Sequence, residues 1–163
     1  MGIDTATKNN STTRPMYQYE YRMPALTADV ILHTDNEVLL IERLREPFKG
    51  KWAIPGGFVD FEEPVADAAA RELKEETTIE LSPSELSLFK LADKKGRDPR
   101  GWVLTGVYSH RLPRPVTAHA NDDAAKAKWF DFDKLPDMAF DHEEILAEFC
   151  QSILTRSSKV ILN

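Results

Sequence analysis

Three glutamates near the middle of the chain are spaced to share one face of a helix. Residues 71–79 read Arg-Glu-Leu-Lys-Glu-Glu-Thr-Thr-Ile, so Glu72, Glu75 and Glu76 stand at positions i, i+3 and i+4. Carboxylates held this close repel one another unless a cation lies among them, and hard oxygen ligands suit Mg²⁺ or Mn²⁺. Such an ion neutralises phosphate oxygens and lowers the pKa of a bound water, which is what hydrolysis of a diphosphate needs.

The wider spacing around these glutamates decides between a metal site and an ordinary acidic surface. Arg71 and Lys74 are interleaved with the glutamates, as on many solvated helix faces. However, Gly57 is followed after five residues by Glu63, and Glu63 after seven residues by Arg71. This segment resembles the Nudix box, which runs Gly, five residues, Glu, seven residues, Arg-Glu-apolar-x-Glu-Glu-x-Gly-apolar. The pattern is long and rarely arises by chance, so the metal site is the favoured interpretation.

One position of the box departs from the family pattern. Thr78 stands where the family has its last glycine. Glycine at the end of a helix commonly takes a left-handed conformation, which a β-branched residue disfavours. We therefore expect the turn after the helix to be built differently, with no carboxylate lost.

The resemblance implies roles for the residues of the box and for the loop before it. The implied metal ligands are Glu72, Glu76, Glu75 and a backbone carbonyl at Gly56 or Gly57. Glu75 and Arg71 are the implied catalytic residues, with Arg71 tying Glu63 and orienting the carboxylates. The alternative for Arg71 is a plain surface ion pair, worth about 0–1 kcal/mol.

A further carboxylate is expected from outside the box, because the family often recruits one from a loop. Asp123 is the first candidate for a catalytic base or extra ligand, since the equivalent loop carries an acidic residue in related enzymes. Asn121-Asp122-Asp123 is equally compatible with simple turn chemistry. Glu143 and Glu144, near the start of the last helix, are runners-up, although acidic residues there also favour the helix dipole.

Substrate recognition is expected from the loop at residues 93–102. Its Arg97-Asp98-Pro99-Arg100-Gly101 segment resembles the ADP-ribose pyrophosphatases of the same superfamily. Arg97 and Arg100 are candidates to clamp a diphosphate or a ribose, and Arg43 is a candidate to reach phosphate. Trp102 or Tyr19 is a candidate to stack on a base. The alternatives are an exposed polar loop for the two arginines and a core aromatic for Trp102.

Composition bounds the class of protein. The chain has 163 residues, 42% apolar and 29% charged, which suits one soluble domain with a real core. A net charge of −6 argues against a groove for nucleic acid, and one cysteine, Cys150, excludes an internal disulfide. No apolar run reaches the length of a membrane span, and no signal peptide is visible at the N-terminus. We therefore expect a cytoplasmic protein with no membrane or nucleic-acid partner.

The order of the expected elements predicts an α/β fold. Residues 1–16 are polar and predict a disordered tail, and residues 17–163 a single domain that begins with alternating tyrosines, packed on the domain or on a second subunit of a homodimer. Strands are expected at 26–33, 37–43, 52–54, 86–92, 102–111 and 126–132. Helices are expected after Gly57 and at 141–157, the latter with Ile145, Leu146, Phe149, Cys150, Ile153 and Leu154 on one side. The resemblance implies a Nudix-type α/β/α sandwich around a mixed sheet, with the catalytic helix following the Gly-Gly loop.

These observations predict an Mg²⁺- or Mn²⁺-dependent pyrophosphohydrolase whose leading substrate is ADP-ribose, cleaved to AMP and ribose 5-phosphate. The rivals are a pyrophosphatase for another nucleotide sugar or a nucleoside triphosphate, and a non-catalytic ADP-ribose sensor. The intact carboxylates oppose the sensor. The chain also ends soon after the last predicted helix, which we take to leave no room for the DNA-binding domain of such regulators.

Overall fold

The computed structural model describes the backbone of residues 20–160 and the side chains of residues 20–155. The elements are β1 (Ala25–His33), β2 (Glu37–Arg43), β3 (Trp52–Ala53), β4 (Gly56–Phe58), α1 (Val65–Thr77), the 3₁₀ turn η1 (Pro83–Glu85), β5 (Ser87–Ala92), β6 (Val103–Arg111), β7 (Ala124–Asp131) and α2 (His142–Val160). The predicted tail at 1–16, and Tyr17 and Tyr19 of the predicted aromatic arm, lie outside the described residues. Tyr21 is described and is 77% exposed.

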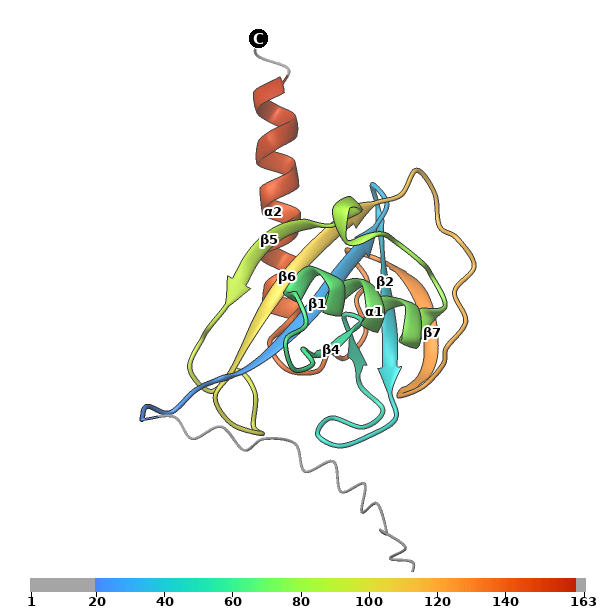
Figure 1. Ribbon diagram of the computed structural model, residues 1–163. Coiled ribbons are helices and arrows are strands. Elements are labelled where there is room, and N and C mark those ends of the chain that lie inside the picture. Colours follow the sequence, from blue (N-terminus) through green and yellow to red (C-terminus); the bar gives the residue numbers. More distant parts are fainter. Residues whose placement is uncertain (1–19, 161–163) are drawn as a thin grey trace, which may run out of the picture.

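The strands form one mixed sheet, as predicted (Figure 1). β1 runs parallel to β6 from the pair Ala25↔Val103 to the pair His33↔Arg111. β2 pairs antiparallel with β7 and β3, and β6 pairs antiparallel with β5. β1 and β2 form the predicted hairpin and meet at the pair His33↔Val38. β1 is therefore the central strand, and it pairs with β2 at the hairpin and with β4 nearer its start.

Alternation along β1 explains the two helical layers. Ala28, Val30 and Leu32 are buried in the cluster that contains the small residues of α1. Ile31 points the other way, into the cluster with Ile145, Leu146 and Phe149 of α2. Successive side chains of a strand point to opposite faces, so one strand serves both cores. Figure 1 shows α1 and α2 on the two sides of the sheet, which confirms the predicted α/β/α sandwich.

Two short elements were not predicted. β4 contains two glycines and has no strand pattern, but it pairs antiparallel with β1 through Asp29↔Gly56 and Thr27↔Phe58. η1 is closed by a capping box in which the Ser82 side chain accepts from the backbone of the turn and the Glu85 side chain accepts from the Ser82 N–H. The apolar face predicted for α2 is shorter than expected, because Leu154 is 70% exposed.

The end of α1 corrects the expectation for Thr78. This residue takes the left-handed conformation, with φ 63° and ψ 5°, and its N–H donates to the Lys74 carbonyl at 2.8 Å. The turn is thus the one that glycine normally builds, formed here by a β-branched residue. Thr78 therefore adopts a left-handed conformation that is energetically unfavourable for a residue with a Cβ atom.

α2 is the longest helix between residues 20 and 160, and its sequence carries several charged residues. Within that described range, no helix combines the length and the apolar character required to cross a membrane.

Candidate active site

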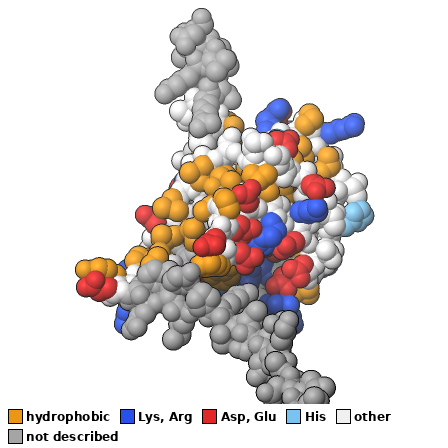
Figure 2. Space-filling view, viewed as in Figure 1, with side chains coloured by type: hydrophobic (Ala, Val, Ile, Leu, Met, Phe, Trp, Pro, Cys, Tyr) orange, Lys and Arg blue, Asp and Glu red, His pale blue; other side chains and the backbone are white. Residues whose placement is uncertain are grey.

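The carboxylates of the box lie along α1 on the side that faces β4. The helix buries Ala68, Ala69 and Leu73 against the sheet, and Glu76 is buried on the same face, so this packing fixes how the helix is rotated. Glu76 is 6% exposed, whereas Glu75 is only half-buried. Figure 2 shows acidic and basic side chains interleaved near the middle of the face on which α1 lies. The packing of the small residues therefore determines which carboxylates become buried.

Arg71 connects the carboxylates to one another. Its Nε and one terminal nitrogen donate to the two carboxylate oxygens of Glu63, each at 2.8 Å. Its other terminal nitrogen donates to Glu72 at 2.7 Å and to Glu75 at 3.2 Å. A further bond at 3.0 Å reaches the Phe58 carbonyl. This network has the form that the sequence predicted for Arg71, and hydrogen bonding to Arg71 lowers the pKa of Glu63 to about 2.

The two glycines of β4 let the backbone approach the carboxylates. The Gly56 N–H donates to Glu76 Oε2 at 2.9 Å. A Cβ atom on Gly57 would lie 2.4 Å from the carboxylate carbon of Glu72, and one on Gly56 would lie 2.2 Å from Asp29 Oδ1. No side chain larger than hydrogen fits at either position unless the Glu72 carboxylate moves at Gly57 and the backbone of β1 moves at Gly56. The Gly56-Gly57 backbone is therefore part of the site.

The buried carboxylates favour a bound cation. The pKa of Glu76 is raised to about 8 and that of Asp29 to about 7, mainly by burial, with nearby carboxylates contributing to both increases. Burial also raises the pKa of Glu72. Hard oxygen donors in a buried, mutually repelling group match the preferences of Mg²⁺ and Mn²⁺.

The acidic side chains are turned toward protein donors rather than gathered around one point. Among the side chains that the structure describes, no three acidic, histidine or cysteine groups converge as a ready-made metal set. Arg71 holds one oxygen of Glu72 and the Gly56 N–H holds one oxygen of Glu76. The residues nonetheless fit a divalent ion by their chemistry.

Asp29 is a site residue to which sequence reasoning assigned no role, and it lies beside His142. Asp29 lies in β1, and its Oδ2 is 3.4 Å from His142 Nε2. The Ile54 N–H donates to His142 Nδ1 at 3.0 Å, so Nε2 carries the proton of the neutral ring and faces Asp29. Burial lowers the pKa of His142 to about 3, which keeps the ring neutral. A buried aspartate in an apolar strand was the signal available in the sequence.

Arg97 lies inside the protein, not on an exposed loop. It is 9% exposed and donates to both oxygens of Asp141, at 2.9 and 2.8 Å. Its remaining terminal nitrogen donates to Thr105 Oγ1. The guanidinium lines the same pocket as Arg43 and Arg100, but its donors are taken by protein acceptors. Arg97 thereby ties the predicted substrate loop to the start of α2.

Arg43 and Arg100 are the cations that border the site most openly. Both line the pocket that also contains Gly56 and Gly57. Arg100 is exposed and pairs with Asp98 at 2.6 Å, and Arg43 is half-buried at the end of β2.

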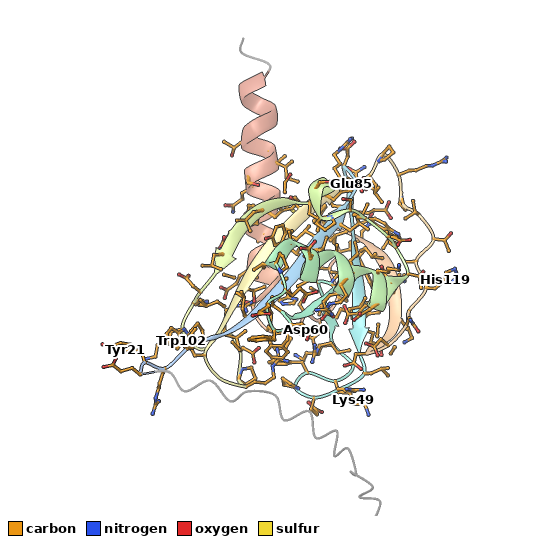
Figure 3. The ribbon with its side chains drawn as sticks, viewed as in Figure 1. Tyr21, Lys49, Asp60, Glu85, Trp102 and His119 are labelled. Atoms are coloured by element: carbon orange, nitrogen blue, oxygen red, sulfur yellow. The ribbon has the colours of Figure 1, made fainter. Side chains whose placement is uncertain are left out.

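Trp102 is 58% exposed, so the core-aromatic alternative is wrong. Figure 3 shows it at the outer end of β6, where a hollow of about 520 Å³ is lined by Trp102 and by residues of the 93–97 loop. A larger hollow of about 890 Å³ lies beside the β1–β2 hairpin and α2, and residues of the box do not line it.

Asp123 lies just before β7, next to the end of β2. Its side chain pairs with Arg45 at 2.9 Å and is 43% exposed. The loop that carries it reaches α1, because the Asn121 N–H donates to the Glu76 carbonyl at 3.2 Å. Asp122 has a left-handed φ of 50°, which shows that turn chemistry is present as well. Glu143 and Glu144 are exposed at the start of α2, where Glu144 pairs with Lys94.

The fold and the carboxylate helix define a recognisable class of protein. The model of the NUDIX domain matches residues 23–149, so the chain belongs to this family. It is 43% identical over 129 residues to an ADP-ribose pyrophosphatase of Methanocaldococcus jannaschii, covering 79% of this chain and 75% of that protein.

Two solved structures have the same fold. The NUDIX domain of NrtR from Shewanella oneidensis, complexed with ADP ribose, is 25% identical with a TM-score of 0.74, covering 82% of this chain and 90% of that one. A bifunctional NMN adenylyltransferase/ADP ribose pyrophosphatase from Francisella tularensis, complexed with AMP and a Mn ion, is 27% identical with a TM-score of 0.74. The match covers 82% of this chain and 43% of that larger one.

Proposed function

We propose that this protein hydrolyses the diphosphate linkage of ADP-ribose, giving AMP and ribose 5-phosphate, in a reaction that depends on a divalent metal ion. The observation that carries the proposal is the buried carboxylate group of Glu72, Glu76 and Asp29 against the Gly56-Gly57 backbone. The similarity to an ADP-ribose pyrophosphatase over three quarters of that protein's length supports the substrate.

Glu72 and Glu76, with Glu75 and the Gly57 carbonyl, are the residues that would hold Mg²⁺ or Mn²⁺. When bound, the cation supplies positive charge against the diphosphate and Lewis acidity for the attacking water. Arg71 keeps Glu63, Glu72 and Glu75 in fixed orientations through its bonds of 2.7 to 3.2 Å. Its contribution is to keep the carboxylates in place before substrate arrives.

The remaining roles belong to residues around the pocket. Arg43 and Arg100 contact the diphosphate, and Trp102 offers an exposed ring on which the adenine stacks. Arg97 holds the loop that carries Arg100 in place through its ion pair with Asp141.

The reaction needs one proton acceptor. Water attacks one phosphorus, the bond from that phosphorus to the bridging oxygen breaks, and a carboxylate accepts the proton of the water. The candidates are Asp123 and Glu75, and Glu75 is half-buried and held by a single 3.2 Å bond to Arg71.

The same proposal includes a cytoplasmic location and a small nucleotide as the partner. Nucleic acid is not expected as a partner, since a net charge of −6 disfavours binding of polyanions.

A substrate panel with product identification tests the function. Purified protein is incubated with ADP-ribose, GDP-mannose, NADH, dinucleoside polyphosphates and nucleoside triphosphates, in Mg²⁺, in Mn²⁺ and in EDTA. We expect the largest kcat/KM for ADP-ribose, with AMP and ribose 5-phosphate as products and no turnover in EDTA. A larger kcat/KM for a triphosphate would refute the substrate, and binding of ADP-ribose without any turnover would favour the sensor.

The variant Glu76→Gln separates the role of the carboxylates from that of the fold. We expect kcat to fall by about 10²–10⁴ with the circular dichroism spectrum unchanged, the scale of losing a key catalytic interaction. The control is Glu80→Gln, an exposed glutamate that pairs with Lys74 and should leave kcat unchanged. Turnover of Glu76→Gln near the wild-type rate in Mg²⁺ would remove the assignment.

A further inference from the structure

One aromatic ring lies close to both arginines that border the pocket. The guanidinium carbon of Arg43 is 4.9 Å from the centre of the Phe140 ring, and that of Arg100 is 5.3 Å from the same ring. Arg100 also lies 4.7 Å from the Phe58 ring. Phe140, Arg43 and Arg100 line the same pocket as Gly56 and Gly57. The ring therefore contacts both cations at the edge of the carboxylate site.

The two arginines that border the pocket differ in their protein partners. Arg100 is paired with Asp98, but Arg43 donates through Nε to the Pro47 carbonyl at 2.9 Å. Among the described residues, no carboxylate forms an ion pair with Arg43. Burial and the nearby Arg100 both lower the pKa of Arg43. Glu76, Asp98 and Asp123 act on Arg43 in the opposite direction, but none of them forms an ion pair with it, so an anion in direct contact would add an attraction that the described residues do not supply.

The position of Phe140 is fixed from several sides. Its backbone is left-handed, with φ 53°, which is unfavourable for a bulky residue and typical of functional sites. Its ring meets the Phe48 ring edge-on at 4.9 Å. The next residue, Asp141, is held by both oxygens in the buried pair with Arg97. These contacts fix the Phe140 ring, so it can hold neighbouring side chains in a defined orientation.

The size of the pocket limits what it can admit. Its cavity is about 50 Å³, and Phe140, Arg43 and Arg100 are among the residues that line it. A nucleoside does not fit in such a space, whereas phosphate oxygens can reach the guanidinium groups at its mouth. Guanidinium groups recognise phosphate through paired N–H donors.

We propose that Phe140 is a positioning residue that holds Arg43 and Arg100 so that both donate to the diphosphate of a nucleotide, and that this pair selects diphosphates over monophosphates. The proposal rests on the proposed function for the identity of the ligand. Each arginine is attracted to the face of the ring, which keeps the two cations close despite their repulsion. Loss of the ring should therefore weaken binding of a diphosphate more than binding of a monophosphate.

The test is calorimetric titration of the full chain with ADP and with AMP in Mg²⁺. We expect Phe140→Leu to weaken ADP binding about tenfold or more and AMP binding less than about threefold, since one oriented charged contact is worth roughly tenfold. Phe140→Tyr keeps the ring face and should restore ADP binding. Phe89→Leu, an aromatic that packs on Phe149 of α2, is the control and should change neither affinity. Equal losses for ADP and AMP, or an unchanged ADP affinity, would overturn the proposal.

A mutant cycle distinguishes positioning from a structural role. Arg43→Gln should weaken ADP binding in the wild-type background and have little further effect in Phe140→Leu. If Phe140→Leu does not fold, the cycle between Arg43→Gln and Arg100→Gln decides alone, and independent, additive effects would overturn the proposal.

The two proposals can fail separately. A protein whose ADP affinity depends on Phe140 but which does not cleave ADP-ribose would refute the function and keep this inference. Cleavage of ADP-ribose with no dependence of ADP affinity on Phe140 would do the reverse.

Discussion

Replacing Thr78 by glycine should make this protein more stable. Thr78 adopts φ 63° and ψ 5° at the end of α1, and its side chain is exposed. A left-handed conformation costs a residue with a Cβ about 1–2 kcal/mol. Glycine removes this cost but adds about 0.5–1 kcal/mol of chain entropy lost on folding. The free energy of unfolding should therefore rise by about 0.5–1 kcal/mol.

The exposed position makes the comparison clean. The backbone bond of Thr78 to Lys74 is kept in the variant, and no hydrogen bond involving the Thr78 side chain is found among the described residues. For a domain of this size, such a gain corresponds to an increase in Tm of about 1–4 °C. Urea unfolding followed by circular dichroism measures the same change as a higher midpoint with an unchanged slope.

Thr78→Ala is the matched control, because it removes the β-branch and keeps the Cβ atom. It should recover less stability than glycine, since the contact between Cβ and the backbone remains. kcat should be unchanged in both variants if the carboxylates of α1 stay in place. A glycine variant with the same or a lower midpoint would show that the left-handed turn carries no strain, and the reasoning would be refuted.

Three further predictions concern the carboxylates. Burial raises the pKa of Glu76 from 4.5 to about 8, so folding takes up a proton and the metal-free protein should become less stable as pH rises through this range. Urea unfolding in EDTA should give a lower free energy of unfolding at about pH 9 than at about pH 6, and Glu76→Gln should reduce this difference. An equal difference in both proteins would contradict the prediction. Arg71→Lys cannot keep the two-pronged bond to Glu63 and should lower kcat/KM about 10–100-fold, whereas retention of full activity would mean a plain surface ion pair. Asp123→Asn should lower kcat strongly with KM within a few-fold, measured against Asp122→Asn; equal, mild effects would favour turn chemistry and move the search to the start of α2.

The sequence by itself determined the local parts of this site. The i, i+3, i+4 spacing places Glu72, Glu75 and Glu76 on one side of any helix that forms there, because helical geometry is set by neighbouring residues. The same holds for the hairpin at residues 26–43, whose polar turn and apolar strands are adjacent in the chain. The contact between Arg71 and Glu63 was predicted from the family resemblance, and the two residues are eight positions apart in the chain.

Only the tertiary structure decided which of these groups are buried and what else joins them. β4 exists because its two glycines pair with β1, and that pairing brings Asp29 against Gly56. His142 reaches Asp29 across 113 positions of the chain, a contact that no local spacing encodes. Arg97 was expected at the substrate but lies buried on Asp141, because the fold brings the start of α2 beneath the loop. Desolvation and long-range contacts depend on the assembled layers, so they could not be read from the residues alone.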